Sequence, residues 1–217
     1  MKIALVGASG FVGTAILKEA LNRGHEVTAI VRNPEKITVK NDHLHVEKAD
    51  VLDAAQVTKA VNGSDAVISA YNSGWANPDM YAEFIKGSES IQHGTKHSDA
   101  KRYIVIGGAG SLEVAPGIQA VDTPDFPAAY KAGATAARDY LNILKEEKEL
   151  NWTFFSPAFE MGPHTSGVRT GNYRTSLDTP VFNAEGRSIL SVEDLAVVII
   201  DELENPKHPK QRFTAGY

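Results

Sequence analysis

Three glycines near the start of the chain have a spacing that could hold a phosphate group. Gly7, Gly10 and Gly13 follow the apolar run at residues 3–6. Gly7 permits a tight turn, Gly10 leaves room for a pyrophosphate at the backbone, and Gly13 lets a helix lie close to the strand. The anion would face the unpaired N–H groups of that helix, and Ser9 would add a hydroxyl donor. We interpret the G-x-x-G-x-x-G segment as a nucleotide site; the alternative is a tight turn without a ligand.

A second candidate residue is Arg32, which follows the strand predicted over residues 25–31. An NAD-specific site would have an Asp or Glu here to accept from the ribose 2′-hydroxyl. A guanidinium instead suits the 2′-phosphate of NADPH, with which it can form charge-assisted hydrogen bonds. The sequence therefore favours NADP (NADPH) over NAD as the cofactor. The alternative is a solvated loop arginine.

The elements that must position these residues alternate between short apolar strands and amphipathic helices. Strands are predicted at residues 2–6, 25–31, 44–46, 65–70, 103–106, 152–157 and 211–215, with a strand-like stretch at 188–190. Helices are predicted at residues 11–23, 53–61, 77–97, 128–150 and 191–203. The alternation implies a Rossmann-type, doubly wound parallel α/β sheet of six or seven strands in the order 3-2-1-4-5-6.

Ligands bind at the carboxyl edge of such a sheet, so the residues that leave its strands are further candidates. Ala70 and Tyr71 follow the fourth predicted strand, and Gly107 follows the fifth. Residues 1–157 are the predicted NAD(P)-binding core, with a loop over the site at 113–127. Residues 158–217 are predicted to form a small C-terminal substrate lobe that packs on this core within a single compact domain. Its segment 161–180 is rich in Gly, Thr, Ser and Pro and is a candidate substrate loop.

Composition excludes several classes of function. With 22 basic and 27 acidic side chains the net charge is -5, and no basic run is present, so nucleic acid is not an expected partner. The absence of cysteine excludes disulfides and thiolate chemistry. His93 and His97 are four residues apart, but no H-E-x-x-H pattern accompanies them, so we interpret them as exposed residues at a helix end and predict no metal site.

The sequence also predicts where in the cell the protein is located. The first predicted strand begins at residue 2, which leaves no room for a signal peptide, and no apolar run reaches membrane-spanning length. We therefore expect a cytoplasmic protein without a membrane partner, either a monomer or a homodimer.

Several segments together resemble the atypical short-chain dehydrogenases of the NmrA-like and NADH-flavin-reductase-like group. The resemblance spans nearly the whole chain and is carried by residues 7–13, 31–34, 107–111, 152–157 and 189–196. It implies that Asp50 and Val51 contact the adenine and that Pro157 touches the nicotinamide. The complete set of expected cofactor contacts is Gly7, Ser9, Gly10, Phe11, Val12, Gly13, Arg32, Asp50, Val51, Ala70, Tyr71, Gly107 and Pro157.

The chain departs from this group at the catalytic pair. Members that reduce carbonyls use Y-x-x-x-K, in which the lysine lowers the tyrosine pKa and the tyrosine protonates the alkoxide. Tyr130 stands where the motif would begin, but position 134 is Ala134, and Lys131 projects about 100° around the helix. The resemblance also assigns Ser111 a hydrogen bond to the reacting carbonyl; the alternative is that its hydroxyl satisfies local backbone groups.

Acceptors that delocalise the incoming charge need less acid catalysis. A flavin or quinone fits this requirement, because positioning over the nicotinamide supplies most of the rate and water completes protonation. The leading hypothesis is an NAD(P)H-dependent reductase of a flavin, quinone or similar conjugated acceptor, with Ser111 and Tyr130 as candidate catalytic residues. The alternative is a non-catalytic, NmrA-like regulator that senses the dinucleotide and binds a protein partner. An epimerase is disfavoured because such members keep the tyrosine-lysine pair.

Overall fold

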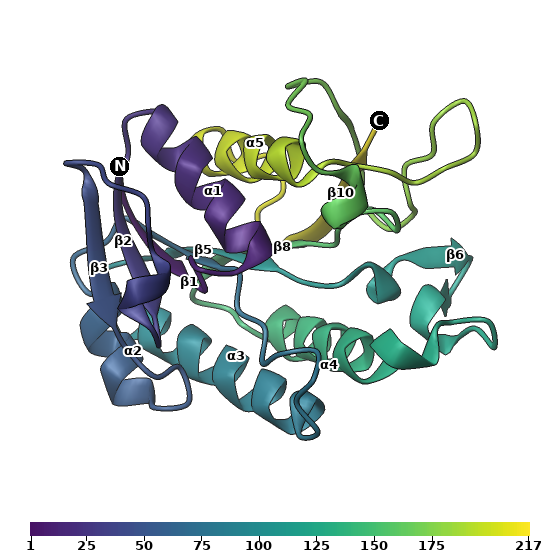
Figure 1. Ribbon diagram of the computed structural model, residues 1–217. Coiled ribbons are helices and arrows are strands. Elements are labelled where there is room, and N and C mark those ends of the chain that lie inside the picture. Colours follow the sequence, from purple (N-terminus) through teal and green to yellow (C-terminus); the bar gives the residue numbers. More distant parts are fainter.

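A single eight-stranded sheet forms the centre of the computed structural model, which describes residues 1–217 (Figure 1). Its strands lie in the order β3-β2-β1-β4-β5-β8-β10-β9, and all neighbours are parallel except β10 and β9. Their bounds are β1 (Lys2–Val6), β2 (Glu26–Val31), β3 (Leu44–Lys48), β4 (Ala66–Ser69), β5 (Arg102–Ile106), β8 (Asn151–Phe155), β9 (Arg174–Ser176) and β10 (Gln211–Gly216). The predicted order of the first six strands is confirmed, and the sheet has eight strands instead of the six or seven expected.

Helices cover both faces of the sheet. One layer contains α1 (Phe11–Asn22) and α5 (Val192–Glu204), and the other contains α2 (Ala54–Val61), α3 (Met80–Lys96) and α4 (Ala128–Lys145) (Figure 1). One-turn 3-10 helices lie at Pro34–Lys36, Ala109–Ser111, Ala120–Asp122 and Pro163–Thr165. None of the helices is both long and apolar enough to cross a membrane.

Alternate residues of the central strands supply the two halves of the core. In β1, Ile3 and Leu5 join the cluster beneath α1 and α5, whereas Ala4 and Val6 join the cluster beneath α2, α3 and α4. A strand buried on both faces needs a continuous apolar run, which explains why β1 shows no polar alternation.

Two helix boundaries differ from those expected by more than one residue, and side-chain hydrogen bonds explain both. The α3 helix begins at Met80 because the Asn77 side-chain oxygen accepts from the Asp79 amide at 2.9 Å and forms a turn first. The α4 helix ends at Lys145 rather than at residue 150. There the Glu147 carboxylate accepts from the Glu149 amide at 2.7 Å, which turns the chain before β8.

The segments before α4 and after β8 contain short strands in addition to the predicted elements. Residues 113–127 include the hairpin of β6 (Glu113–Ala115) and β7 (Ile118–Gln119). After residue 157 the chain forms the predicted helix α5, which packs on α1, and the predicted strand β10, which pairs with β8. The additional strand there is β9, which pairs with β10. The segment 188–190 contributes an isolated bridge between Ile189 and Glu160. The C-terminal part of the chain therefore completes the sheet and covers one of its faces.

Candidate functional site

The turn between β1 and α1 is built from glycines that serve different purposes. Gly7 has a positive φ of 79°, and a Cβ there would lie 2.6 Å from the Ala70 carbonyl oxygen. A Cβ on Gly13 would overlap the Gly7 carbonyl oxygen. At Gly10, however, the nearest atom to a Cβ would be the Gly7 carbonyl oxygen at 3.4 Å, which is an ordinary contact. Protein packing explains Gly7 and Gly13, whereas the room at Gly10 is open to a ligand.

The first turn of α1 presents donors without protein acceptors. Gly10 is the N-cap, no side chain caps the helix, and the first turn contains no acidic residue. The amide groups of Phe11, Val12 and Gly13 therefore keep the free hydrogen atoms that every helix start provides. Ser9 and Phe11 are exposed beside them. The arrangement fits a pyrophosphate group.

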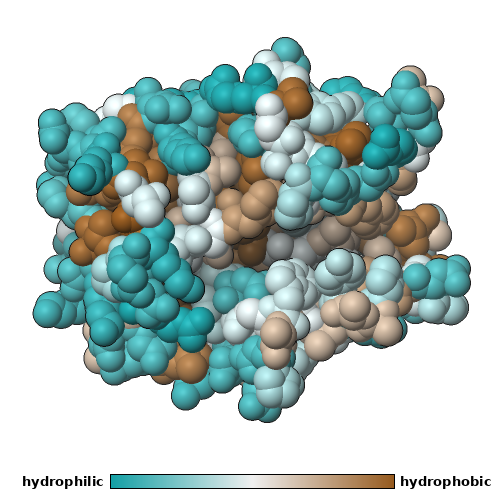
Figure 2. All heavy atoms as spheres, viewed as in Figure 1, coloured by the Kyte–Doolittle hydropathy of each residue, from teal (hydrophilic) through white to brown (hydrophobic).

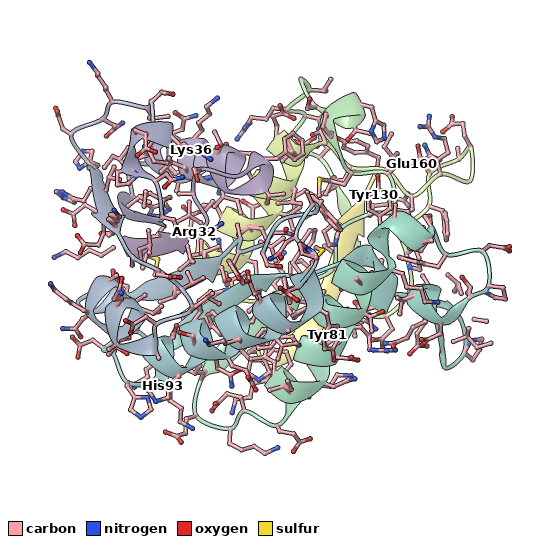
Figure 3. All side chains as sticks on the ribbon, turned by 60° about the horizontal axis from the view of Figure 1, so that its bottom comes forward. Arg32, Lys36, Tyr81, His93, Tyr130 and Glu160 are labelled. Carbon is pink, nitrogen blue, oxygen red and sulfur yellow. The ribbon has the colours of Figure 1, made fainter.

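The loops after β2, β3 and β4 come together next to this turn. Arg32 is exposed at the end of β2 and makes no ion pair (Figure 3). The pKa of Tyr71 is raised to about 12, and burial is the largest cause. The charges of Glu83 and Asp50 also raise this pKa, whereas the charge of Arg32 lowers it. Arg32 follows β2 and Asp50 follows β3, so both lie at the same edge of the parallel sheet as Tyr71, which follows β4. The Arg32 guanidinium is therefore an exposed positive charge at this edge.

The side chains at this edge are not all available to a ligand. The Tyr71 hydroxyl donates to the Glu83 carbonyl at 3.1 Å, and its ring stacks on Phe84 at 5.9 Å, so the ring packs against α3. The Ala70 carbonyl lies against Gly7, as described above. Asp50 accepts from the Leu52 amide with one oxygen and keeps the other free, whereas Val51 is only 6% exposed.

The turn after β5 forms the other end of the site. A Cβ on Gly107 would overlap the ring of Phe154, so a side chain is excluded there. Ser111 is fully buried; its hydroxyl donates to the Gly108 carbonyl at 3.0 Å and lies 2.8 Å from the Ser156 hydroxyl oxygen. Pro157 is also buried. The local hydrogen bonds at Ser111 are those of the alternative interpretation, and a contact with an acceptor stays a prediction.

Tyr130 lies in the first turn of α4 and is 55% exposed, with no hydrogen-bond partner for its hydroxyl. One turn later, Ala134 is buried against Gly110, so this position offers no ammonium group to the tyrosine. The ring instead meets Trp75 edge to face, with centroids 5.4 Å apart and planes at 85°. Trp75 is 61% exposed and is not among the site residues that the sequence predicted. Its signal in the sequence is a large aromatic in the loop that follows β4 at the carboxyl edge.

The carboxyl edge is hollowed and partly apolar. Figure 2 shows apolar side chains gathered in a depression between the layer of α1 and α5 and the layer of α3 and α4. Exposed aromatic residues of the chain include Phe11, Trp75, Tyr130, Phe159 and Phe182.

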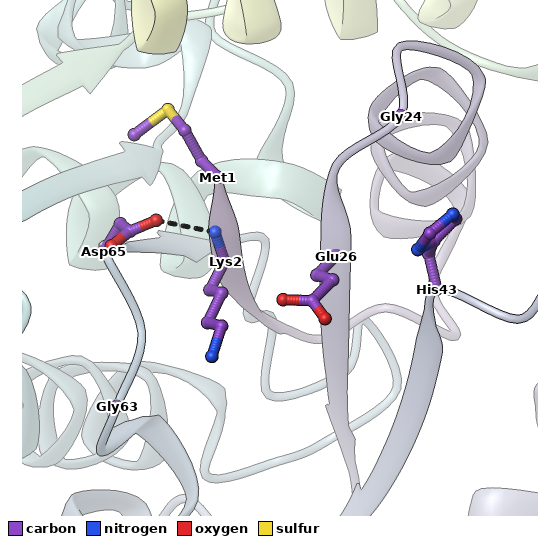
Figure 4. A pocket seen from close by; sticks show the side chains of 7 residues that line it. All are labelled: Met1, Lys2, Gly24, Glu26, His43, Gly63 and Asp65. Carbon is purple, nitrogen blue, oxygen red and sulfur yellow. Dashed lines mark hydrogen bonds between the residues drawn. The ribbon is translucent and has the colours of Figure 1, made fainter.

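Two other places are less suited to the cofactor. A hollow of about 500 Å³ at the opposite edge is bordered by Lys2, Glu26 and Asp65, and there the Lys2 amide donates to Asp65 at 2.7 Å (Figure 4). It lies at the amino ends of β1 and β2, away from the glycine turn. His93 and His97 stack at 4.1 Å at the end of α3, and no group of three or more potential metal-binding side chains occurs in the chain.

A parallel sheet in the order 3-2-1-4-5, with an uncapped helix start after a glycine turn, defines a Rossmann-type dinucleotide-binding protein. The chain belongs to the NAD(P)H-binding family, whose model matches residues 7–206. This membership confirms the resemblance to the atypical short-chain dehydrogenases that residues 7–13 and the other matching segments carry.

Individual relatives agree with this assignment. YwnB of Bacillus subtilis, an uncharacterized protein, is 39% identical over 99% of this chain and 97% of its own length. A crystal structure from Bacteroides thetaiotaomicron, provisionally called an epimerase, is 50% identical with a TM-score of 0.91 and covers 100% of this chain and 96% of that one. A Streptococcus pneumoniae structure, provisionally called an NADH-flavin reductase, is 38% identical with a TM-score of 0.86 and covers 100% and 99%.

Proposed function

We propose that the protein is an NADPH-dependent reductase that transfers hydride to a flavin, a quinone or a similar conjugated acceptor. The observation that carries this proposal is the environment of Tyr130, which has Ala134 rather than a lysine one turn away and is open to solvent. A simple ketone would need an activated acid at this position, whereas a conjugated acceptor spreads the incoming charge over its rings.

The chain's own residues supply binding and orientation. The amides of Phe11 and Val12 would hold the pyrophosphate above Gly10, and Arg32 would hold the 2′-phosphate. When bound, NADPH supplies the hydride. Gly107 and Pro157 would border the nicotinamide, and water would deliver the proton to the reduced acceptor. The similarity to the Streptococcus pneumoniae protein supports a flavin as one candidate acceptor.

NADPH oxidation by the purified protein tests the proposal. We expect turnover with FMN, FAD or menadione and none with a simple ketone such as cyclohexanone. Ketone reduction that depends on Tyr130 would contradict it. Tight NADPH binding without turnover of any acceptor would instead favour the dinucleotide-sensing regulator.

A further inference from the structure

The two tryptophans of the chain have opposite environments. Trp152 is 3% exposed within the core, whereas Trp75 is 61% exposed. An indole gains about 3 kcal/mol or more from burial, so hydrophobic folding gives little reason to keep one at a surface. Trp75 also lies in the loop after β4, and β4 is one of the two strands between which the sheet order reverses. Ligands bind at this point in doubly wound sheets.

The exposed indole nevertheless packs against α4 at a defined position. Tyr130 and Gly133 are one turn apart on the same face of this helix, and Trp75 packs across both. A Cβ on Gly133 would lie 3.1 Å from a ring carbon of Trp75 and would overlap Met80. Glycine at position 133 therefore makes the space in which the indole rests.

The loop that carries Trp75 is held at both ends. The Ser73 hydroxyl donates to the Met80 carbonyl at 2.9 Å, and the Gly74 amide donates to the Asn72 side chain at 2.7 Å. The Asn77 side chain donates to the Glu83 carboxylate at 2.8 Å. Ordering of this loop before a ligand binds lowers the entropy that binding would otherwise cost.

We infer that Trp75 and Tyr130 form the acceptor subsite, in which a flat aromatic acceptor stacks on one ring while its edge meets the other. The two ring planes are nearly perpendicular and form a corner. A planar ring system can contact both rings of this corner, whereas a bulky, non-planar substrate cannot. This inference rests on the proposed function, because it places the conjugated acceptor of that reaction. It assigns Trp75 the role of selecting planarity, separate from any proton transfer.

Calorimetric titration of FMN and of menadione into the protein saturated with NADP⁺ tests the subsite without turnover. We expect Trp75→Leu to raise the Kd of both acceptors about 5- to 100-fold, the range that loss of one aromatic stacking partner produces. Trp75→Phe keeps an aromatic ring at the same position and should retain most of the affinity for both acceptors. Tyr81→Leu is the matched control, since Tyr81 is another exposed aromatic that contacts α4, through a hydrogen bond to Asp139, and lies apart from Tyr130 (Figure 3). It should change neither Kd.

The affinity for NADP⁺ separates stacking from a merely structural role. If Trp75→Leu weakens NADP⁺ and acceptor binding to the same degree, Trp75 only supports the loop and the inference is wrong. An unchanged acceptor Kd, or a wild-type protein that binds neither acceptor, would also overturn it. Trp75-dependent binding without NADPH oxidation would uphold the subsite and reject the reductase, whereas oxidation that is insensitive to Trp75 would do the reverse.

Discussion

The Tyr217 hydroxyl donates a hydrogen bond of 2.6 Å to the carboxylate of Asp194, and so ties the end of β10 to the first turn of α5. The same carboxylate accepts from the backbone amides of Thr170 and Gly171 at 2.9 and 2.8 Å. One buried acidic side chain thus joins the helix, the strand and the candidate substrate loop. The Arg169 side chain adds a second attachment of this loop through an ion pair with Glu19.

Acid should weaken this junction. Burial alone would raise the pKa of Asp194, but the hydrogen bonds from Tyr217, Gly171 and Thr170 outweigh it and lower the pKa below its ordinary value. A carboxyl group with a lowered folded-state pKa stabilises the fold above its unfolded pKa of about 3.9 and loses that contribution as pH falls through the folded pKa. In urea denaturation from about pH 6 to about pH 3, Asp194→Asn should be less stable than wild type, with a difference that shrinks at the acidic end. A constant difference would show that ionisation of Asp194 is not responsible.

The glycines of the first turn should separate folding from binding. Gly10→Ala meets no protein atom closer than 3.4 Å, so the variant should unfold at the wild-type denaturant concentration. Its methyl group would occupy the space of the pyrophosphate and should weaken NADPH binding about tenfold or more. Gly13→Ala should lower both stability and affinity, because its Cβ overlaps the Gly7 carbonyl. Equal NADPH affinity in Gly10→Ala and wild type would place the dinucleotide elsewhere.

Arg32 should determine the preference between the two dinucleotides. Its exposed guanidinium has no protein partner, so Arg32→Ala should leave stability unchanged while NADPH binding loses on the order of 1.5 to 3 kcal/mol. NADH binding should change little. Lys59→Ala, which removes an exposed charge on α2, is the control for a general electrostatic effect. Calorimetry that finds the same NADPH preference in Arg32→Ala and wild type would reject this role.

Tyr130→Phe tests the proposed chemistry. Removal of an exposed hydroxyl without a hydrogen-bond partner should leave stability intact. Flavin or quinone reduction should fall by much less than the 100-fold or more that general acid catalysis typically contributes. A large loss of turnover with an unchanged acceptor KM would identify Tyr130 as an activated acid. Carbonyl reduction would then be the favoured activity.

Ser111→Ala offers the contrasting case. Its hydroxyl is buried, and the substitution leaves the Ser156 hydroxyl without this partner, so the free energy of unfolding should drop by about 1 to 3 kcal/mol. We also expect a larger loss of turnover than in Tyr130→Phe, because the turn after β5 loses a bond that fixes its position. Urea denaturation and NADPH oxidation on the same preparations check both effects. Wild-type stability in Ser111→Ala would mean that the hydroxyl pair contributes nothing.

The sequence predicted the central sheet well because its strands are short apolar runs separated by amphipathic helices. Gly24 and Asp53 also behave as their types suggest: Gly24 has a positive φ after α1, and the Asp53 side chain caps α2. By contrast, β9 has three residues at a sheet edge, and only its pairing with β10 distinguishes it from a loop.

The candidate site was predicted less completely because side-chain packing determines which groups face a ligand. Tyr71 has the right place in the sequence, yet its ring packs against α3. The Ser111 hydroxyl pairs with that of Ser156, which is 45 residues away in the chain. Trp75 was not predicted as a site residue because a local sequence pattern shows neither its exposure nor its packing against Gly133.

The position of β10 between β8 and β9 has a consequence for how the protein is made. While the chain is being synthesised, the edge of β8 has no partner until residues 211–216 emerge, and α1 lacks its cover until α5 is present. An incomplete chain therefore exposes both an unpaired strand edge and an apolar helix face, which are the features that promote association with other chains. Newly made protein should thus be most vulnerable to aggregation before both α5 and β10 have been added.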